Sequence, residues 1–434
     1  MMKCSSLLLA LGAGLLANGA SLAGTWSPAR TLEGPIAVAS PPSPPLVAVN
    51  AGGHALYAWN ASGAVRFSER AKGQAWSASR PVPGGGTGAG PVALAIGDND
   101  VAAIAYTTVA TRYEPQHLLV SLRPRGGSFL GAVEPAPGAA AGDMRLAVAC
   151  DGTVTLVWAN AVGIWASQLP GTPGSGACDG AAGPGPWSAP RLLSNSNVGA
   201  ALPELAHNAA GAALVVWQEG APGNPSSVAA AWRDAGGAWQ PPQTISAPTA
   251  RQTWNPKPAL DRAGNAAVGY LDGNTMVVVR RPVAGGWSTP VLISGTQTVY
   301  YPALAMNGNG DLLAAWLAID PSTGTGAVWQ SLAPAGAPWP APARASARGE
   351  GADWPSAAFA TDGSVALVGW TDDATNTTRA AVYSAGAWTR HSLGAGWWGS
   401  PVPVAAGGGV AAVGWPQPAA GNPNSAKLKG RTWQ

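Results

Sequence analysis

Residues 302–316 read PALAMNGNGDLLAAW, and this stretch contains the unit from which the chain is built. A short apolar run ends in Asn, a glycine-rich turn follows, and a segment of small and apolar residues leads to Trp316. Two apolar runs joined by such a turn indicate a β-hairpin. The hairpin pattern recurs along the chain with its closing aromatic residue at Trp59, Tyr106, Trp158, Trp217, Tyr270, Trp316, Trp370 and Trp415.

A second signature follows the hairpins and is clearest at Gly285-Gly286-Trp287-Ser288-Thr289-Pro290, before another apolar strand. A further apolar segment separates the two signatures, so each repeat holds four short strands. Related Trp residues occur at Trp76, Trp187, Trp239, Trp339 and Trp388, and Phe129 takes this place in the second repeat. Four strands in a repeat of roughly fifty residues are typical of a β-propeller blade. We expect the recurrent aromatic residues to pack between blades rather than bind ligand.

The two ends of the chain are out of phase with this repeat. Residues 25–32 (TWSPARTL) resemble a fourth strand without the first three, and the last repeat stops after its third strand, AKLKGRTW. We therefore predict an all-β, eight-bladed propeller of four-stranded antiparallel blades, closed by the N-terminal strand completing the last blade. Seven blades is the alternative, if the divergent second repeat containing Asp100 and Phe129 is not a blade.

The first 23 residues have the features of a cleavable signal peptide. Lys3 supplies the positive charge, residues 4–18 are apolar, and Ser21-Leu22-Ala23 fits the small-x-small cleavage pattern. The prediction is a secreted or periplasmic protein cleaved near Ala23, with residues 24–434 forming a single propeller domain. No later apolar run reaches the length of a membrane span.

Two cysteines, Cys150 and Cys178, remain after the predicted cleavage. An even pair in an oxidising compartment indicates a disulfide, and two unpaired thiols are the alternative. Cys150 falls in the turn between the first two strands of the third repeat, and Cys178 falls in the connection between its last two strands. Those connections emerge at the same end of a four-stranded meander, so the two residues can meet.

Composition excludes several classes of function. Charged residues make up 10% of the chain and the net charge is +3, without a cluster of Lys and Arg, so we expect no nucleic-acid partner. Gly and Pro are abundant, but 21 Trp residues argue against disorder. The four His residues lie in different repeats, and no metal-binding, phosphate-binding or serine-hydrolase motif is present, so we expect no metal and no cofactor.

The candidate binding site is on the face of the propeller that carries the links between blades. Links in the second half of the chain carry aromatic residues, and the first three links carry none. Aromatic rings beside amides and carboxylates suit the apolar faces and hydroxyl groups of sugars. The alternative is that these aromatic residues plug the channel mouth or pack between blades. The predicted ligand-binding residues are Trp254, Tyr300, Tyr301, Trp354, Trp397, Trp398, Arg251, Arg348, Asp353 and Asp272. Other polar residues of these loops include Gln297, Glu219, Glu350, Asp372 and Asp373.

Through its repeated Trp-Ser-x-Pro and Gly-Gly-x-Trp elements the chain resembles the sialidase-like and lectin-like bacterial β-propellers. The resemblance implies a glycan ligand. Sialidases have six blades, Asp-box turns and an early Arg motif, which are not found in this sequence, so no catalytic residue is carried over. We expect a binding protein rather than an enzyme, with a glycan or cell-surface polysaccharide as partner. The alternatives are a sialidase-like or lyase-like enzyme and a protein-binding surface module.

Overall fold

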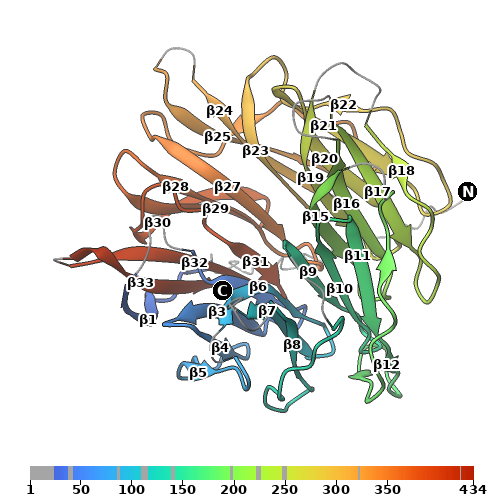
Figure 1. Cartoon of the computed structure of the whole chain (residues 1–434). Coiled ribbons are helices and arrows are strands. Elements are labelled where there is room, and N and C mark those ends of the chain that lie inside the picture. The colour runs from blue at the N-terminus through green and yellow to red at the C-terminus, as the bar shows by residue number, and fades with distance from the viewer. Residues whose placement is uncertain are drawn as a thin grey trace, which may run out of the picture.

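The computed structural model describes residues 24–37, 43–85, 88–108, 116–137, 142–195, 199–220, 226–246, 252–320, 323–420 and 422–434. Its regular elements are β-strands, gathered into eight blade sheets around a common centre (Figure 1) and a two-stranded ribbon. Within these ranges no helix has the length and apolar character needed to cross a membrane. We number the blades 1 to 8 in chain order, starting from the sheet that contains residues 46–81.

The inner half of each blade is a hairpin made from the first repeat signature. The first strands lie closest to the centre of the ring and are β2 (Leu46–Val49), β6 (Gly88–Ile96), β9 (Met144–Val148), β15 (Ala200–His207), β19 (Thr253–Leu260), β23 (Val299–Met306), β27 (Ala352–Phe359) and β31 (Val404–Gly407). The second strands are β3 (Ala55–Ala61), β7 (Ala102–Thr108), β10 (Val154–Ala159), β16 (Ala213–Glu219), β20 (Ala266–Asp272), β24 (Leu312–Ile319), β28 (Ala366–Asp372) and β32 (Val410–Ala419).

The outer half of each blade completes an antiparallel meander. The third strands are β4 (Ala64–Arg70), β8 (Leu118–Arg123), β11 (Ile164–Leu169), β17 (Ser227–Arg233), β21 (Thr275–Arg281), β25 (Gly326–Ala333), β29 (Thr377–Ser384) and β33 (Asn422–Trp433). The fourth strands are β5 (Arg80–Pro81), β14 (Arg191–Leu192), β18 (Gln243–Thr244), β22 (Val291–Leu292), β26 (Ala343–Arg344), β30 (Ala387–Ala395) and β1 (Arg30–Ala37).

Blade 2 is a true blade, although its fourth strand is reduced to a single bridge. Its sheet contains β6, β7 and β8, and Val133 pairs with Val120 of β8 where the fourth strand lies in other blades. Phe129 occupies the place of the recurrent Trp and contacts Phe67 of blade 1, with ring centroids 4.6 Å apart. The prediction of eight blades is confirmed, and the seven-blade alternative is wrong.

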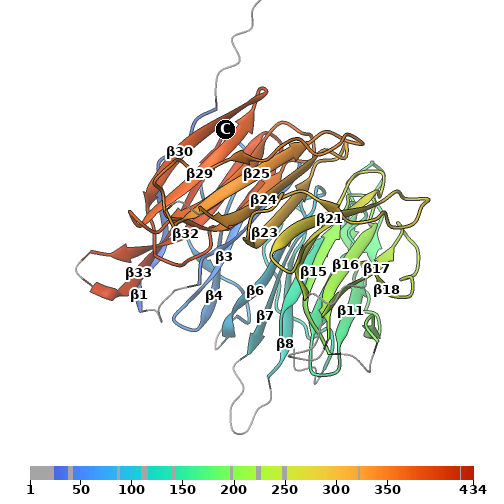
Figure 2. The same cartoon turned by 90° about the horizontal axis from the view of Figure 1, so that it is seen from above.

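The ring is closed by the N-terminal strand, as predicted. β1 pairs antiparallel with β33, with Arg30 opposite Gly430, and the sheet order is β1-β33-β32-β31. Figures 1 and 2 both show these two strands side by side. The strand spans Arg30–Ala37 rather than residues 25–32, and Trp26 meets Trp433 in an isolated bridge. Pro28 has no N–H to donate, which interrupts the ladder between the two regions.

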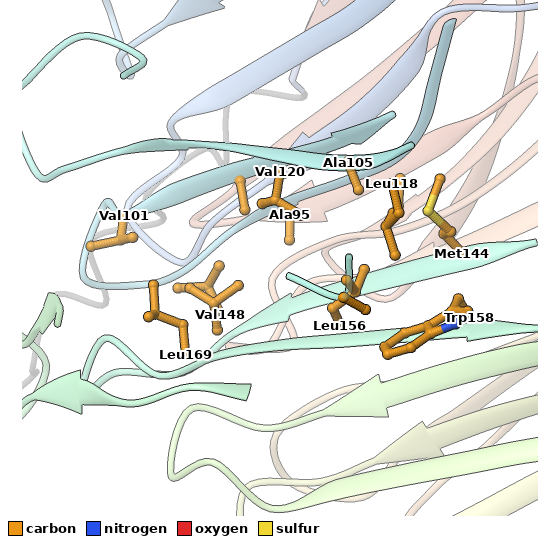
Figure 3. Close-up of a cluster of buried hydrophobic side chains, with 14 residues drawn as sticks. Ala95, Val101, Ala105, Leu118, Val120, Met144, Val148, Leu156, Trp158 and Leu169 are labelled. Carbon is orange, nitrogen blue, oxygen red and sulfur yellow. The ribbon is translucent and has the colours of Figure 1, made fainter. Parts of the chain in front are cut away.

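The closing aromatic residues of the hairpins form the cores between blades, as predicted. All eight are at most 1% exposed. Trp158, for example, lies in a cluster with Leu118 of blade 2 and with Met144 and Leu156 of its own blade (Figure 3). The small residues between the aromatics let neighbouring sheets approach closely, so each Trp buries most of its large surface.

Asparagine side chains join consecutive blades at the turns between first and second strands. The amide of Asn50 donates to the carbonyl of Gly97 at 3.1 Å, and that of Asn99 donates to the carbonyl of Ala149 at 3.0 Å. Asn208 makes the same kind of bond to blade 5. The sequence analysis did not predict this role between blades.

The disulfide is also as predicted. Cys150 and Cys178 are bonded with their Cα atoms 4.4 Å apart. The bond fastens the long connection that carries the ribbon of β12 (Gly171–Thr172) and β13 (Ala181–Ala182). Such a bond is consistent with an extracellular or periplasmic protein. The predicted signal peptide, residues 1–23, lies outside the described residues.

Candidate functional site

The links between blades and the turns between second and third strands share one face, which we call the link face. In blade 7 the N–H of Asp373, in such a turn, donates to the carbonyl of Gly351 in the preceding link at 2.8 Å. In blade 5 the N–H of Gly273 donates in the same way to Gln252 at 2.8 Å. In each of these two blades, the bond holds the turn next to the preceding link, at the end of the innermost strand.

A bulge near the start of the innermost strand recurs in blades 4 to 7. The register of each strand shifts there, and the bulged residue has a positive φ. A β-bulge bends its strand and redirects a side chain. The four residues occupy equivalent positions on the link face, and each precedes a proline: Leu202 (φ 55°), Asn255 (56°), Tyr301 (47°) and Trp354 (49°).

The bulges of blades 6 and 7 bring two aromatic rings into contact. Tyr301 and Trp354 stack with their centroids 4.1 Å apart and an interplanar angle of 24°. Tyr300 lies next to this pair, with its centroid 6.5 Å from that of Tyr301. All three side chains are half-buried, so part of each ring remains accessible.

Two carboxylates lie beside the stacked rings. Asp353 accepts the N–H of Trp354 at 2.8 Å, and Asp373 accepts the N–H of Gly399 at 3.3 Å. Burial raises the pKa of both carboxyl groups, and the charge of Asp353 raises that of Asp373 further. Burial and the charge of Asp353 also raise the pKa of Tyr301. The site therefore resists any further negative charge.

Trp398 borders this group from the next link. It directly precedes Gly399 and is 64% exposed, which is high for a Trp side chain. Its neighbour Trp397 is buried at 9% exposure, so it offers little surface to a ligand. We define the aromatic mouth as Tyr300, Tyr301, Asp353, Trp354, Asp373 and Trp398.

The remaining predicted residues lie apart from the stack or have other roles. Trp254 packs against the core between blades 5 and 6, and its indole N–H donates to the carbonyl of Gly273 at 3.2 Å. Asp272 is half-buried at the end of β20, and Arg348 is exposed in the link before blade 7. Arg251 lies outside the described residues.

The link aromatics are not equivalent to one another, although the sequence analysis treated them as one set. Trp254, Tyr300 and Asp353 stand just before the bulge, whereas Tyr301 and Trp354 occupy the bulge itself. Local sequence did not reveal the bulge, because a non-glycine residue with positive φ is uncommon. The signal that could have shown it is the proline after each bulged residue. Aligning the repeats on this proline puts Leu202 and Asn255 at the same position as Tyr301 and Trp354.

Three polar residues assigned to the candidate site instead satisfy the indole N–H groups of buried Trp residues. A buried indole N–H needs an acceptor. The acceptors are Glu219 for Trp217, Gln297 for Trp316 and Glu350 for Trp370, at 2.9, 3.2 and 3.3 Å. These polar side chains are part of the packing between blades rather than of a ligand site.

Three charged side chains, one from each blade, join the innermost strands of blades 3 to 5. Glu204 accepts from Arg145 Nε at 2.6 Å and is also paired with Lys257. Burial opposes ionisation of Glu204, but the two cations outweigh it and lower its pKa to about 2. Both cations are thus paired with the same carboxylate. The described residues also include no cluster of three or more His, Cys, Asp or Glu side chains suited to a metal ion.

Comparisons with known proteins identify the architecture and not a family. No family model matches the chain, and no curated protein matches it in sequence. Among solved structures, puromycin hydrolase is similar with a TM-score of 0.51 and 15% identity, over 90% of this chain and 61% of that one. A prolyl endopeptidase gives 0.50 and 15%, over 86% and 53%, and a streptogramin B lyase gives 0.46 and 11%, over 80% and 94%.

The likenesses to the puromycin hydrolase and the prolyl endopeptidase support the propeller fold alone. The chain spans about three fifths of the length of the puromycin hydrolase, 61%. Propellers with unrelated activities share this architecture, so any function has to be argued from the site itself.

Proposed function

We propose that the protein is an exported carbohydrate-binding propeller that holds a neutral glycan at the aromatic mouth. The observation that carries the proposal is the stacked pair Tyr301 and Trp354, with centroids 4.1 Å apart, on bulges that turn both rings to the link face. The rings expose part of their surface, whereas the eight closing aromatic residues of the hairpins are at most 1% exposed. An exposed aromatic surface with polar groups around it is a common form of binding site.

The chemistry of the mouth matches that of a sugar. A pyranose ring presents an apolar C–H face, which packs on an aromatic ring, and a rim of hydroxyl groups. Asp353 and Asp373 can accept hydrogen bonds from those hydroxyls, and a charged acceptor makes the stronger bond. Trp398, 64% exposed, extends the apolar surface along the rim and suits a second sugar unit.

The electrostatics favour a neutral glycan over an acidic one. The pKa values of Asp353, Asp373 and Tyr301 are raised, so a ligand carboxylate would meet groups that already resist negative charge. A sialidase-like site would instead need cations converging on the ligand. Arg145 and Lys257 are the cations of the innermost strands of blades 3 and 5, and both are already paired with Glu204.

The test is a binding measurement with neutral and sialylated oligosaccharides on an array, followed by titration calorimetry with the strongest ligand. We expect neutral glycans to bind and Trp354→Ala to weaken them about tenfold or more, which corresponds to about 1.4 kcal/mol. Leu202→Ala is the matched control, because Leu202 occupies the equivalent bulge in blade 4. We expect it to leave the affinity unchanged.

Two results would contradict the proposal. Preferential binding of sialylated glycans would show that the charge argument is wrong. An array without any bound glycan would favour the protein-binding alternative, in which the exposed Trp398 and its neighbours contact another protein.

A further inference from the structure

A second pocket lies between the outer strands of blades 6 and 7, away from the aromatic mouth. It has a volume of about 320 Å³. Blade 6 contributes Gln330, Arg344 and Ala345, and blade 7 contributes Trp388 and Arg390. Because all eight blades are built from one repeat, each residue that lines the pocket can be compared with the residue at the same position in the other blades.

Gln330 is a polar residue at a position that is apolar in the other blades. It pairs across β24 and β25 with Ala315, the residue before the closing aromatic. Its side chain is 7% exposed, and its Oε1 atom has no hydrogen-bond partner among the residues that the structure describes. The equivalent residues are Phe67, Val120, Ala166, Ala230, Val278, Ala380 and Gly430.

The space in the pocket comes from a second change in blade 6. Ala345 donates its N–H to the third strand of its own blade, as the equivalent residues of four other blades do. Those residues are buried and larger: Val82, Leu193, Ile245 and Ile293. A small residue at this position removes the side chain that fills the gap elsewhere.

A third change supplies charge. Arg344 stands opposite Trp329 in the ladder, where the equivalent residues of blades 1, 3, 4 and 5 are Pro81, Leu192, Thr244 and Leu292. Arg344 Nη1 lies 3.3 Å from the carboxylate of Asp320. Arg390 donates to the carbonyls of Ala345 at 2.6 Å and Arg344 at 3.0 Å. Two guanidinium groups thus flank the pocket beside one paired carboxylate.

We propose that this pocket, the inter-blade pocket, binds a small hydroxy acid, such as a sugar acid. A buried amide oxygen without a donor costs about 1–3 kcal/mol, and an unfilled gap adds to that cost. Two changes that weaken packing and one that adds charge occur together in one blade, and all three residues line one cavity. A ligand hydroxyl would supply the donor that Gln330 Oε1 lacks, and its carboxylate would accept from the guanidinium groups of Arg344 and Arg390. The half-buried ring of Trp388 would contact its apolar side.

The experiment is titration calorimetry of the full chain carrying Trp354→Ala, so that a neutral sugar cannot bind at the aromatic mouth, with glucuronate, glucose and inorganic phosphate at millimolar concentrations. We expect glucuronate to bind and the other two to bind about tenfold more weakly or not at all, because neither combines a carboxylate with neutral hydroxyls. Arg390 is exposed, so Arg390→Gln should fold normally and weaken glucuronate binding by a similar factor. Trp354→Ala, at the mouth, should leave glucuronate binding unchanged.

A double variant, Gln330→Val with Ala345→Ile, introduces the residue types found in blade 5. It tests whether the pocket is needed for glucuronate binding and whether it lowers the stability of the protein. We expect it to melt at a higher temperature than the parent protein and to lose glucuronate binding. The proposal is overturned if glucuronate does not bind, if glucose or phosphate binds equally well, or if Arg390→Gln binds glucuronate as the parent does. None of these outcomes depends on whether the mouth binds a glycan.

Discussion

Asn208 shows how one side chain can tie two blades together. Its amide donates to the carbonyls of Asp261 at 3.0 Å and Arg262 at 3.3 Å, and its Oδ1 accepts the N–H of Ala212 at 3.0 Å. The residue is 8% exposed, so water cannot readily replace these partners. We expect Asn208→Ala to lower the free energy of unfolding by about 2–3 kcal/mol, since each net bond contributes about 1 kcal/mol.

Urea unfolding of this variant measures the effect. Asn309→Ala is the control, because Asn309 lies in the corresponding turn of blade 6 and is exposed. A loss of stability equal in the two variants would show that the turn, and not the contact between blades, is responsible.

His54 makes the stability of the blade 1–blade 2 contact depend on pH. Burial disfavours its imidazolium, but the hydrogen bond that it donates to Asp100 and its ion pair with Glu69 outweigh burial and raise the pKa of His54 to about 9. Its Nδ1 lies 2.7 Å from Asp100 Oδ1. The free pKa of histidine is about 6.5, so this contribution is complete below about pH 6.5 and is lost as pH rises through about 9.

We therefore expect the free energy of unfolding to fall between pH 6.5 and 9, and His54→Gln to reduce that slope. Urea titrations at these two pH values provide the measurement. A variant with the slope of the parent protein would mean that another group titrates in this range.

At the scale of elements, the ribbon of β12 and β13 depends on its disulfide. The bond between Cys150 and Cys178 closes a segment with a sequence separation of 28. A loop of that size adds about 3–4 kcal/mol by restricting the unfolded chain. We expect the double variant Cys150→Ser, Cys178→Ser to lose a similar amount and to melt at a lower temperature. Melting with and without reductant checks this, and the variant itself should not respond to reductant.

The strands could be predicted because their signals repeat and depend on local chemistry. The turn at residues 307–310 and the closing Trp316 have counterparts in the other repeats, so hairpins and blade number followed from periodicity. The bulges were missed, because positive φ at Trp354 is set by the sheet and not by its own preference, and only the proline after each bulged residue marks the position. The role of Glu350 was also missed, since its Trp370 partner is 20 residues away and only the fold brings them together.

At the scale of the whole molecule, stability depends on the closure of the ring. Leu32 of β1 is 5% exposed and packs with Tyr57, Trp59 and Leu428, which belong to blades 1 and 8. Removing its side chain should cost about 2–4 kcal/mol by leaving a cavity. We expect Leu32→Ala to lower the melting temperature and to leave unfolding as one cooperative transition. Circular dichroism and Trp fluorescence, recorded on the same samples, measure this transition. Thr31→Ala, at the exposed neighbouring position, is the control.

Separate transitions by the two probes would show that the blades melt independently. In that case closure would hold the last blade alone rather than the ring.

The pairing of β1 with β33 also sets an order of events during synthesis. Thr31 and Lys429, which meet in the closed ring, are 398 positions apart in the chain. At about 5–20 residues per second, a ribosome needs roughly 20–80 s to make the intervening chain. Through that interval one of the earliest strands has no partner, and seven blades can assemble before it finds one. The ring therefore cannot close until β33 has been synthesised.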